Sequence, residues 1–211
     1  EFWLKKDAYV ADQEYFEFIF DAHVTGTVAN DADYGRFLVA LATTGTVQNT
    51  SNQPFFVQYG SGTMAINKYL GSSTLTTASI ADGKWHHYAV RAHTSGSDTV
   101  FDLFVDGEHN DTLLTGSTIG YVSGAIVATV GAQAAAITSG SVHSGSRGWS
   151  KFSGSLDEVR YWKTWRTSKK IQRYWFDQVG GGTNTDTSNT HLGVYYKFNE
   201  GIVGDTSIDS T

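Results

Sequence analysis

Acidic side chains are the first candidates for chemistry in this chain, because retaining glycoside hydrolysis needs two carboxyl groups about 5 Å apart on one face. Glu14 and Glu17 are three residues apart, and Asp157 and Glu158 are neighbours. On a strand, both spacings place the two carboxyl groups on opposite faces of the sheet. The sequence also lacks a Gly-x-Ser-x-Gly turn and a glycine-rich phosphate loop before a helix. We therefore expect that the protein is not an enzyme.

Histidine and cysteine give little support for a transition-metal site. His86 and His87 are adjacent on a predicted strand, so they point to opposite faces and cannot both ligate one ion. The chain has no cysteine, which excludes disulfides, thiolate chemistry and cysteine-bound zinc.

The segment from Thr138 to Ser155 is rich in glycine and serine, and it contains Trp149 between Arg147 and Lys151. Aromatic residues on loops are better binding candidates than those in the core. Sugars stack their C–H faces on flat rings, so we predict Trp149 and Arg147 as ligand-binding residues. The alternative is that Trp149 folds back as a lid over the end of the molecule.

The elements that must position these residues are strands. The chain has 211 residues, 14% aromatic residues and 23 glycines, which suits one all-β domain. From Tyr15 to Val24 the residues alternate, with Phe16, Phe18 and Phe20 expected on one face. Further strands are expected at 35–42, 54–59, 64–70, 85–92, 100–105, 125–131, 156–162 and 194–198.

One short helix is expected after these strands. Ile171, Tyr174, Trp175 and Val179 recur at helical spacing. Thr167 or Ser168 is the expected cap, and the glycines at 180–182 end the helix.

Charge and hydropathy exclude two classes of partner. The net charge is −6 without a basic stripe, so we expect no nucleic-acid partner. The longest weakly polar run, from Ala125 to Ile137, is too short to span a bilayer, so we expect no membrane insertion. A surface rich in Ser, Thr and Gly and poor in Lys favours an extracellular, cell-surface or virion-surface location. The opening Glu1-Phe-Trp-Leu-Lys5 already reads as a strand, as expected of a processed chain or of one module in a longer protein.

Three motifs occur in a recognisable order. They are Asp82-Gly-Lys-Trp-His-His-Tyr88, Phe104-Val-Asp-Gly107 and Ser153-Gly-Ser-Leu-Asp-Glu-Val-Arg160, followed by the short helix. This order resembles the laminin-G-like, concanavalin A-like jelly rolls over residues 1–201. The resemblance implies an all-β jelly-roll sandwich of two antiparallel sheets with one short surface helix, and we expect residues 1–211 to form one such domain.

The resemblance also implies a structural calcium ion, since an aspartate at the position of Asp157 often binds calcium in related folds. Oxygen ligands suit this ion, and Asn199 and Glu200 are the expected partners. The alternative is that Asp157 caps a loop and that Glu158 pairs with Arg160. Residues 192–211 are expected to supply a closing strand beside Glu1–Lys5, followed by a linker.

The function expected from the resemblance is non-catalytic recognition or adhesion outside the cell, with a carbohydrate or glycoprotein surface as the partner. The glucanases that it also resembles carry a Glu-x-Asp-x-x-Glu strand, which this chain lacks, so a glycoside hydrolase is disfavoured. The alternative is a structural module of a virion or an adhesin repeat, which would bind protein neighbours in an assembly.

Overall fold

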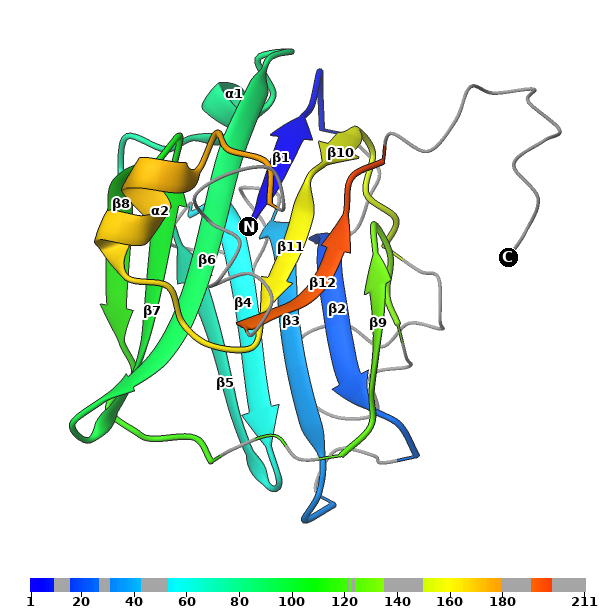
Figure 1. The fold of residues 1–211 in the computed structure, drawn as a ribbon, viewed down its shortest axis with the longest axis vertical. Coiled ribbons are helices and arrows are strands. Elements are labelled where there is room, and N and C mark those ends of the chain that lie inside the picture. The colour runs from blue at the N-terminus through cyan, green and yellow to red at the C-terminus, as the bar shows by residue number, and fades with distance from the viewer. Residues whose placement is uncertain are drawn as a thin grey trace, which may run out of the picture.

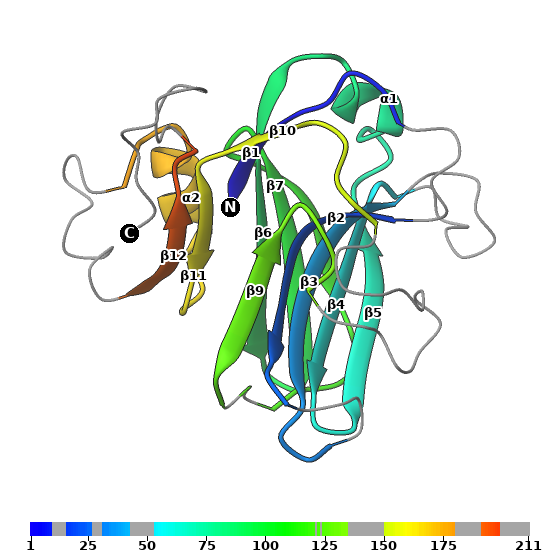
Figure 2. The same cartoon turned by 90° about the vertical axis from the view of Figure 1, so that its right-hand side faces the viewer.

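Two antiparallel sheets packed face to face form the body of the molecule (Figures 1 and 2). This computed structural model describes residues 1–9, 16–26, 31–42, 53–120, 122, 124–134, 150–179 and 191–198. The predicted all-β sandwich is confirmed. Besides the one expected surface helix, the structure has a single-turn helix, α1 (Thr77–Ile80), which begins with a capping box between Thr76 and Ser79.

The first sheet has the strand order β10-β1-β6-β7-β8. Its strands are β1 (Phe2–Lys5), β6 (Trp85–Ser95), β7 (Asp98–Val105), β8 (Glu108–Leu114) and β10 (Ser155–Asp157). The predicted hairpin at Asp106-Gly107 joins β7 to β8, with both residues at positive φ as a type I′ turn requires.

The second sheet has the strand order β5-β4-β3-β2-β9. Its strands are β2 (Phe16–Val24), β3 (Gly35–Ala42), β4 (Phe55–Ser61), β5 (Met64–Leu70) and β9 (Ile126–Val130). The pairing of β2 with β3 shifts between Phe18 and Phe20. As a result Phe16 and Phe18 join a separate cluster, and the expected single face of phenylalanines is wrong.

The last two strands form a small separate sheet of β11 (Val159–Trp162) and β12 (Leu192–Tyr196). The predicted position of the C-terminal strand beside Glu1–Lys5 is therefore wrong, since β1 lies between β10 and β6. Glu158, at positive φ, separates β10 from β11 and redirects the chain away from the first sheet.

Helix α2 (Ser168–Tyr174) covers the outer face of β6 and β7 (Figure 1). Ile171 packs there against Ala89 and Phe104. Its cap is Thr167, as predicted, and its side chain accepts a hydrogen bond from the Lys170 amide.

The main core lies between the two sheets, where apolar side chains of both inner faces meet. Its fully buried members include Leu4, Ile19, Leu41, Phe55 and Phe101. The described helices are all too short or too polar to cross a membrane.

Candidate binding site

An exposed tryptophan stands on the connection between β11 and α2, which crosses the outer side of β6 (Figure 1). Trp165 is 54% exposed, although it is one of the largest apolar side chains in the molecule. Its ring stacks on the ring of His93, with centroids 5.1 Å apart and planes 22° apart. The Arg91 guanidinium carbon lies 5.4 Å from the same indole centroid. The Trp165 ring thus presents a flat surface that His93 and Arg91 of β6 hold in place.

A polar network fixes this tryptophan relative to the first sheet. Arg91 donates hydrogen bonds from Nε and Nη1, to Asp102 Oδ2 at 2.9 Å and to the Arg166 carbonyl at 2.9 Å. Asp102 is only 4% exposed, and Thr112 also donates to it at 2.6 Å. Because Arg91 bonds both the sheet and the crossing segment, the residue next to Trp165 cannot move independently of β6.

The ring beneath Trp165 is uncharged at neutral pH. Burial lowers the pKa of His93, and the positive charge of Arg91 lowers it further, against an opposing contribution from Asp102. A neutral imidazole stacks on an indole without the desolvation cost of a cation. One aromatic face backed by another, with a guanidinium beside it, is a surface suited to a ring with apolar faces and polar edges.

A groove of about 910 Å³ opens between β6 and β11 beside this platform. The inner face of the second sheet forms its floor, with Phe20, Phe37 and Tyr59. Tyr161 on β11 stacks on Phe20 with ring centroids 5.4 Å apart. The lining of the groove is aromatic towards the core. Towards α2 it is basic, because Arg91 and Arg166 lie there.

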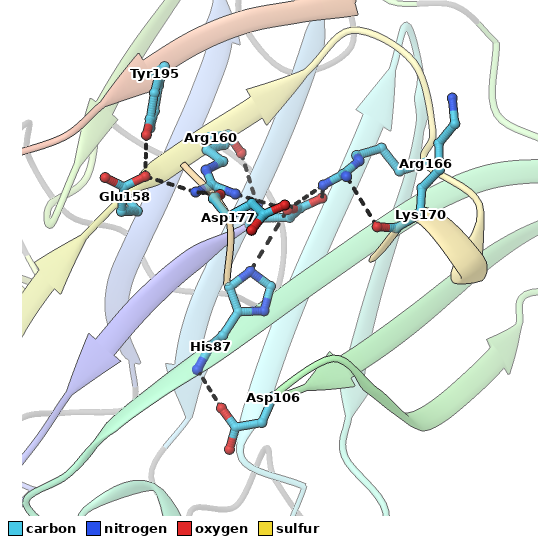
Figure 3. Close-up of polar contacts among 9 residues, drawn as sticks. His87, Asp106, Glu158, Arg160, Arg166, Lys170, Asp177 and Tyr195 are labelled. Atoms are coloured by element: carbon cyan, nitrogen blue, oxygen red, sulfur yellow. Dashed lines mark hydrogen bonds and ion pairs between the residues drawn. The ribbon is translucent and has the colours of Figure 1, made fainter. Parts of the chain in front are cut away.

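A buried cluster of charges closes the upper end of the groove, where Glu1 meets β11 and α2. Arg166 Nη1 lies 2.6 and 2.7 Å from the two carboxylate oxygens of Glu1. Arg160 donates to Glu158 at 2.8 Å and to the Asp177 carbonyl at 2.6 Å (Figure 3). Tyr195 on β12 also donates to Glu158. These contacts join β1, β11, β12 and the end of α2.

The electrostatics of this cluster favour the ionised form of the Glu1 carboxylate. Burial would raise the pKa of Glu1, but the His87 imidazole and nearby positive charges, Arg166 among them, outweigh it and hold the pKa below its usual range. Burial lowers the pKa of His87, so this ring is neutral at pH 7. A permanently ionised carboxylate beside two arginines is a poor proton donor or acceptor at neutral pH.

The predicted calcium residue lies on β10. Asp157 Oδ1 accepts a hydrogen bond from the Glu158 amide at 2.8 Å, and Glu158 pairs with Arg160, as the alternative interpretation expected. In the described ranges, no three His, Asp or Glu side chains gather closely enough to hold a metal ion. Asn199 and Glu200 lie outside those ranges, so calcium at Asp157 stays a prediction.

The two predicted ligand-binding residues, Trp149 and Arg147, also lie outside the described residues. Sequence reasoning missed Trp165, although the same rule applies to it. Trp165 follows the last residue of a predicted strand by three positions and stands between Thr164 and Arg166, in a short polar connection. An aromatic residue in such a connection was the available signal.

Comparison with known proteins gives one result. The family model described as the concanavalin A-like lectin/glucanases superfamily matches residues 1–172. No curated protein matches the chain. The matched range contains both five-stranded sheets, β11 and Trp165, and it ends within α2.

Proposed function

Since this chain belongs to the concanavalin A-like lectin/glucanase superfamily, we propose that it is a non-catalytic recognition module that binds carbohydrate on Trp165. The observation that carries the proposal is the exposed indole stacked on His93. Because His93 already holds the Trp165 ring in place, binding loses less side-chain conformational entropy. Lys163 is exposed beside this ring in the groove lining and offers a donor for sugar hydroxyl groups.

The burial and pairing of three carboxylates support a module without catalysis. Glu17 pairs with Lys6, Asp21 with Arg36 and Glu158 with Arg160, each at 2.8 Å or less. A general acid for glycoside hydrolysis must reach the substrate. A carboxylate that is buried and paired with a cation has no such access. We place the module on an exterior surface, where glycans are the abundant partners.

A glycan array followed by titration of the best ligand tests this proposal. Trp165→Ala should weaken binding at least about tenfold, which corresponds to about 1.4 kcal/mol of lost stacking. Trp85→Ala is the matched control, because Trp85 is also exposed (43%) but lies at the opposite end of β6. It should bind as the unmodified protein does.

Two results would contradict the assignment. A blank array would remove carbohydrate as the ligand. Loss of binding in Trp149→Ala but not in Trp165→Ala would transfer the site to the loop residue predicted from the sequence. Thermal unfolding of each variant checks that the fold is retained.

A further inference from the structure

The connection from β11 to α2 and the helix itself carry a local excess of positive charge. Residues 163–173 contain five of the chain's 15 Lys and Arg residues and none of its 21 Asp and Glu residues. The whole chain has a net charge of −6, so this patch has the opposite sign to the molecule that carries it. Such a patch attracts ligands of negative charge.

Four of these five cations are exposed. Arg166 is the exception, because it is buried and lies close to both carboxylate oxygens of Glu1. The exposed cations are Lys163, Lys169, Lys170 and Arg173. Within the part of the chain that the structure describes, none of the four forms an ion pair. The Lys170 side chain points away from the buried charge cluster (Figure 3).

The exposed cations lie on both sides of Trp165 along the chain. Lys163 precedes the indole by two residues and lies beside it. Arg91, whose guanidinium carbon lies 5.4 Å from the indole centroid, also donates to the Ser168 hydroxyl group at 3.3 Å. Ser168 is the first residue of α2, and Lys169 follows it. The first turn of the helix is therefore held by the same residue that supports the indole.

The charges on α2 do not stabilise this helix. Ile171 packs on the first sheet, so Lys169 and Arg173, two positions to either side of it, both point away from the sheet. Two cations four residues apart destabilise a helix by about 0.2–0.5 kcal/mol. The first turn also contains Lys170 and no acidic residue, although the helix dipole favours negative charge there. Charges that oppose helix stability in this way are expected at functional sites.

We propose that the glycan bound on Trp165 is acidic, and that its negatively charged groups lie against Lys163 and the outer side of α2. The inference rests on the proposed function, since it names the class of sugar for that site. A sugar ring stacked on the indole places its neighbours in the glycan next to cations on either side. Lysine ammonium groups bind anionic oxygens as point charges, so they suit carboxylate and sulfate groups alike.

A single-stranded nucleic acid also combines flat rings with negative charge. The charge distribution favours the glycan. Nucleic-acid binding requires a basic groove that follows the phosphate backbone over several nucleotides, whereas this patch has four exposed cations on a chain of net negative charge. A short acidic glycan needs only the patch itself.

The test compares glycans that differ only in charge. Hexamers of galacturonate, mannuronate and glucuronate are each measured beside their neutral methyl esters, and maltohexaose is measured with and without sulfate groups. At about 50 mM salt, at least one acidic form should bind tenfold more tightly than its neutral form, and the ratio should fall at about 0.5 M salt because the charges are screened. The uronates and the sulfated sugar show which anionic group is preferred. Equal binding of acidic and neutral forms would overturn the proposal, as would the absence of binding by every acidic form.

Lysine variants locate the charges that matter. The double variant Lys163→Gln/Lys169→Gln should weaken binding of the preferred acidic glycan at least fivefold and leave the affinity for its neutral form unchanged. Lys84→Gln is the matched control, because the Lys84 side chain is 77% exposed and precedes the opposite end of β6. It should bind both forms as the unmodified protein does. An equal loss in Lys84→Gln would show that the effect does not depend on the patch.

Two further arms separate this inference from its alternatives. Neutral and acidic glycans that bind equally well, and that both lose binding in Trp165→Ala, would overturn the charge preference and leave the proposed sugar platform in place. Binding of the acidic glycan that Trp165→Ala does not weaken would contradict both. A hexamer of deoxythymidine that binds more tightly than every acidic glycan would assign the patch to nucleic acid and overturn the proposal.

Discussion

Two histidines of β6, His86 and His93, have pKa values that are shifted in opposite directions by their neighbours. Burial alone would lower the pKa of His86, but hydrogen bonds with Asp106 and Asp82 outweigh it and raise the pKa. Burial and Arg91 lower the pKa of His93. The contribution of His86 to stability is thus complete below its unfolded pKa of about 6.5 and is lost as pH rises through the folded pKa. For His93 the contribution is present above about pH 6.5 and is lost as pH falls through the folded pKa.

The two histidines can be separated by mutation. The loss of melting temperature in His86→Asn should be larger at about pH 5.5 than at about pH 8, because only the protonated ring bonds both aspartates as a cation. The loss in His93→Asn should show the opposite trend. Thermal unfolding of both variants and the unmodified protein at the two pH values measures this. Parallel pH trends for the two variants would contradict these environments.

Gly107, in the β7–β8 turn, lacks space for a side chain. It has φ of +80°, and a Cβ atom there would overlap the Trp175 indole. Gly96 has φ of +60° with nothing within 4 Å of such a Cβ, so Gly96→Ala should cost only the backbone strain, about 1–2 kcal/mol. Gly107→Ala should cost about 1–3 kcal/mol more from overpacking. Urea unfolding of both variants compares them, and equal costs would show that Trp175 does not pack on this turn.

At the scale of elements, a buried ion pair joins segments far apart in the sequence. Lys6 Nζ lies 2.7 Å from Glu17 Oε2, with side-chain exposures of 0% and 1%. Lys6 also donates to the Ser153 carbonyl at 2.7 Å, and the Ser153 amide donates to Glu17 at 2.9 Å. The pair thereby connects the end of β1, the start of β2 and the segment that leads into β10.

Removing one member of this pair should be costlier than removing both. Lys6→Met leaves Glu17 charged and buried, so it should destabilise the protein by about 3–5 kcal/mol. The double variant Lys6→Met/Glu17→Gln should recover part of that loss, because no uncompensated charge remains. Urea unfolding of the single and double variants gives the coupling energy. Additive losses would contradict the contact.

Local patterns in the sequence predicted most elements, whereas pairing between distant segments escaped them. The segments 35–42 and 64–70, separated by turn-rich pieces, were correctly predicted as strands, and the Asp106-Gly107 turn was correctly predicted as a hairpin. The sequence did not reveal the irregularity between Phe18 and Phe20, because a bulge moves the following side chains to the other face of the sheet without a change in residue type. The partner of β12 is set by Glu158, which turns the chain between β10 and β11. No pattern within 192–198 contains that information.

At the scale of the whole molecule, two five-stranded sheets form the frame on which the candidate site lies. The fold and its superfamily could be predicted from motif order, because each motif is a strand edge with a turn. The candidate site could not be predicted, because the Trp165 ring is held by contacts with His93 and Arg91. These two residues lie some seventy residues earlier in the chain. Contacts between the β11–α2 connection and the distant strand β6 depend on the tertiary arrangement of the sheets, which local sequence patterns do not contain.

Two-dimensional ¹⁵N NMR tests carbohydrate binding at Trp165, because the six tryptophan indoles can be followed individually. The labelled protein is titrated with the glycan that binds best on the array, and the indole N–H resonances are followed. We expect saturable shifts of the Trp165 indole and of the His93 and Arg91 amides, with the Trp85 indole unchanged and the glycan intact at the end. Shifts that leave Trp165 unaffected, or glycan cleavage during the titration, would contradict it.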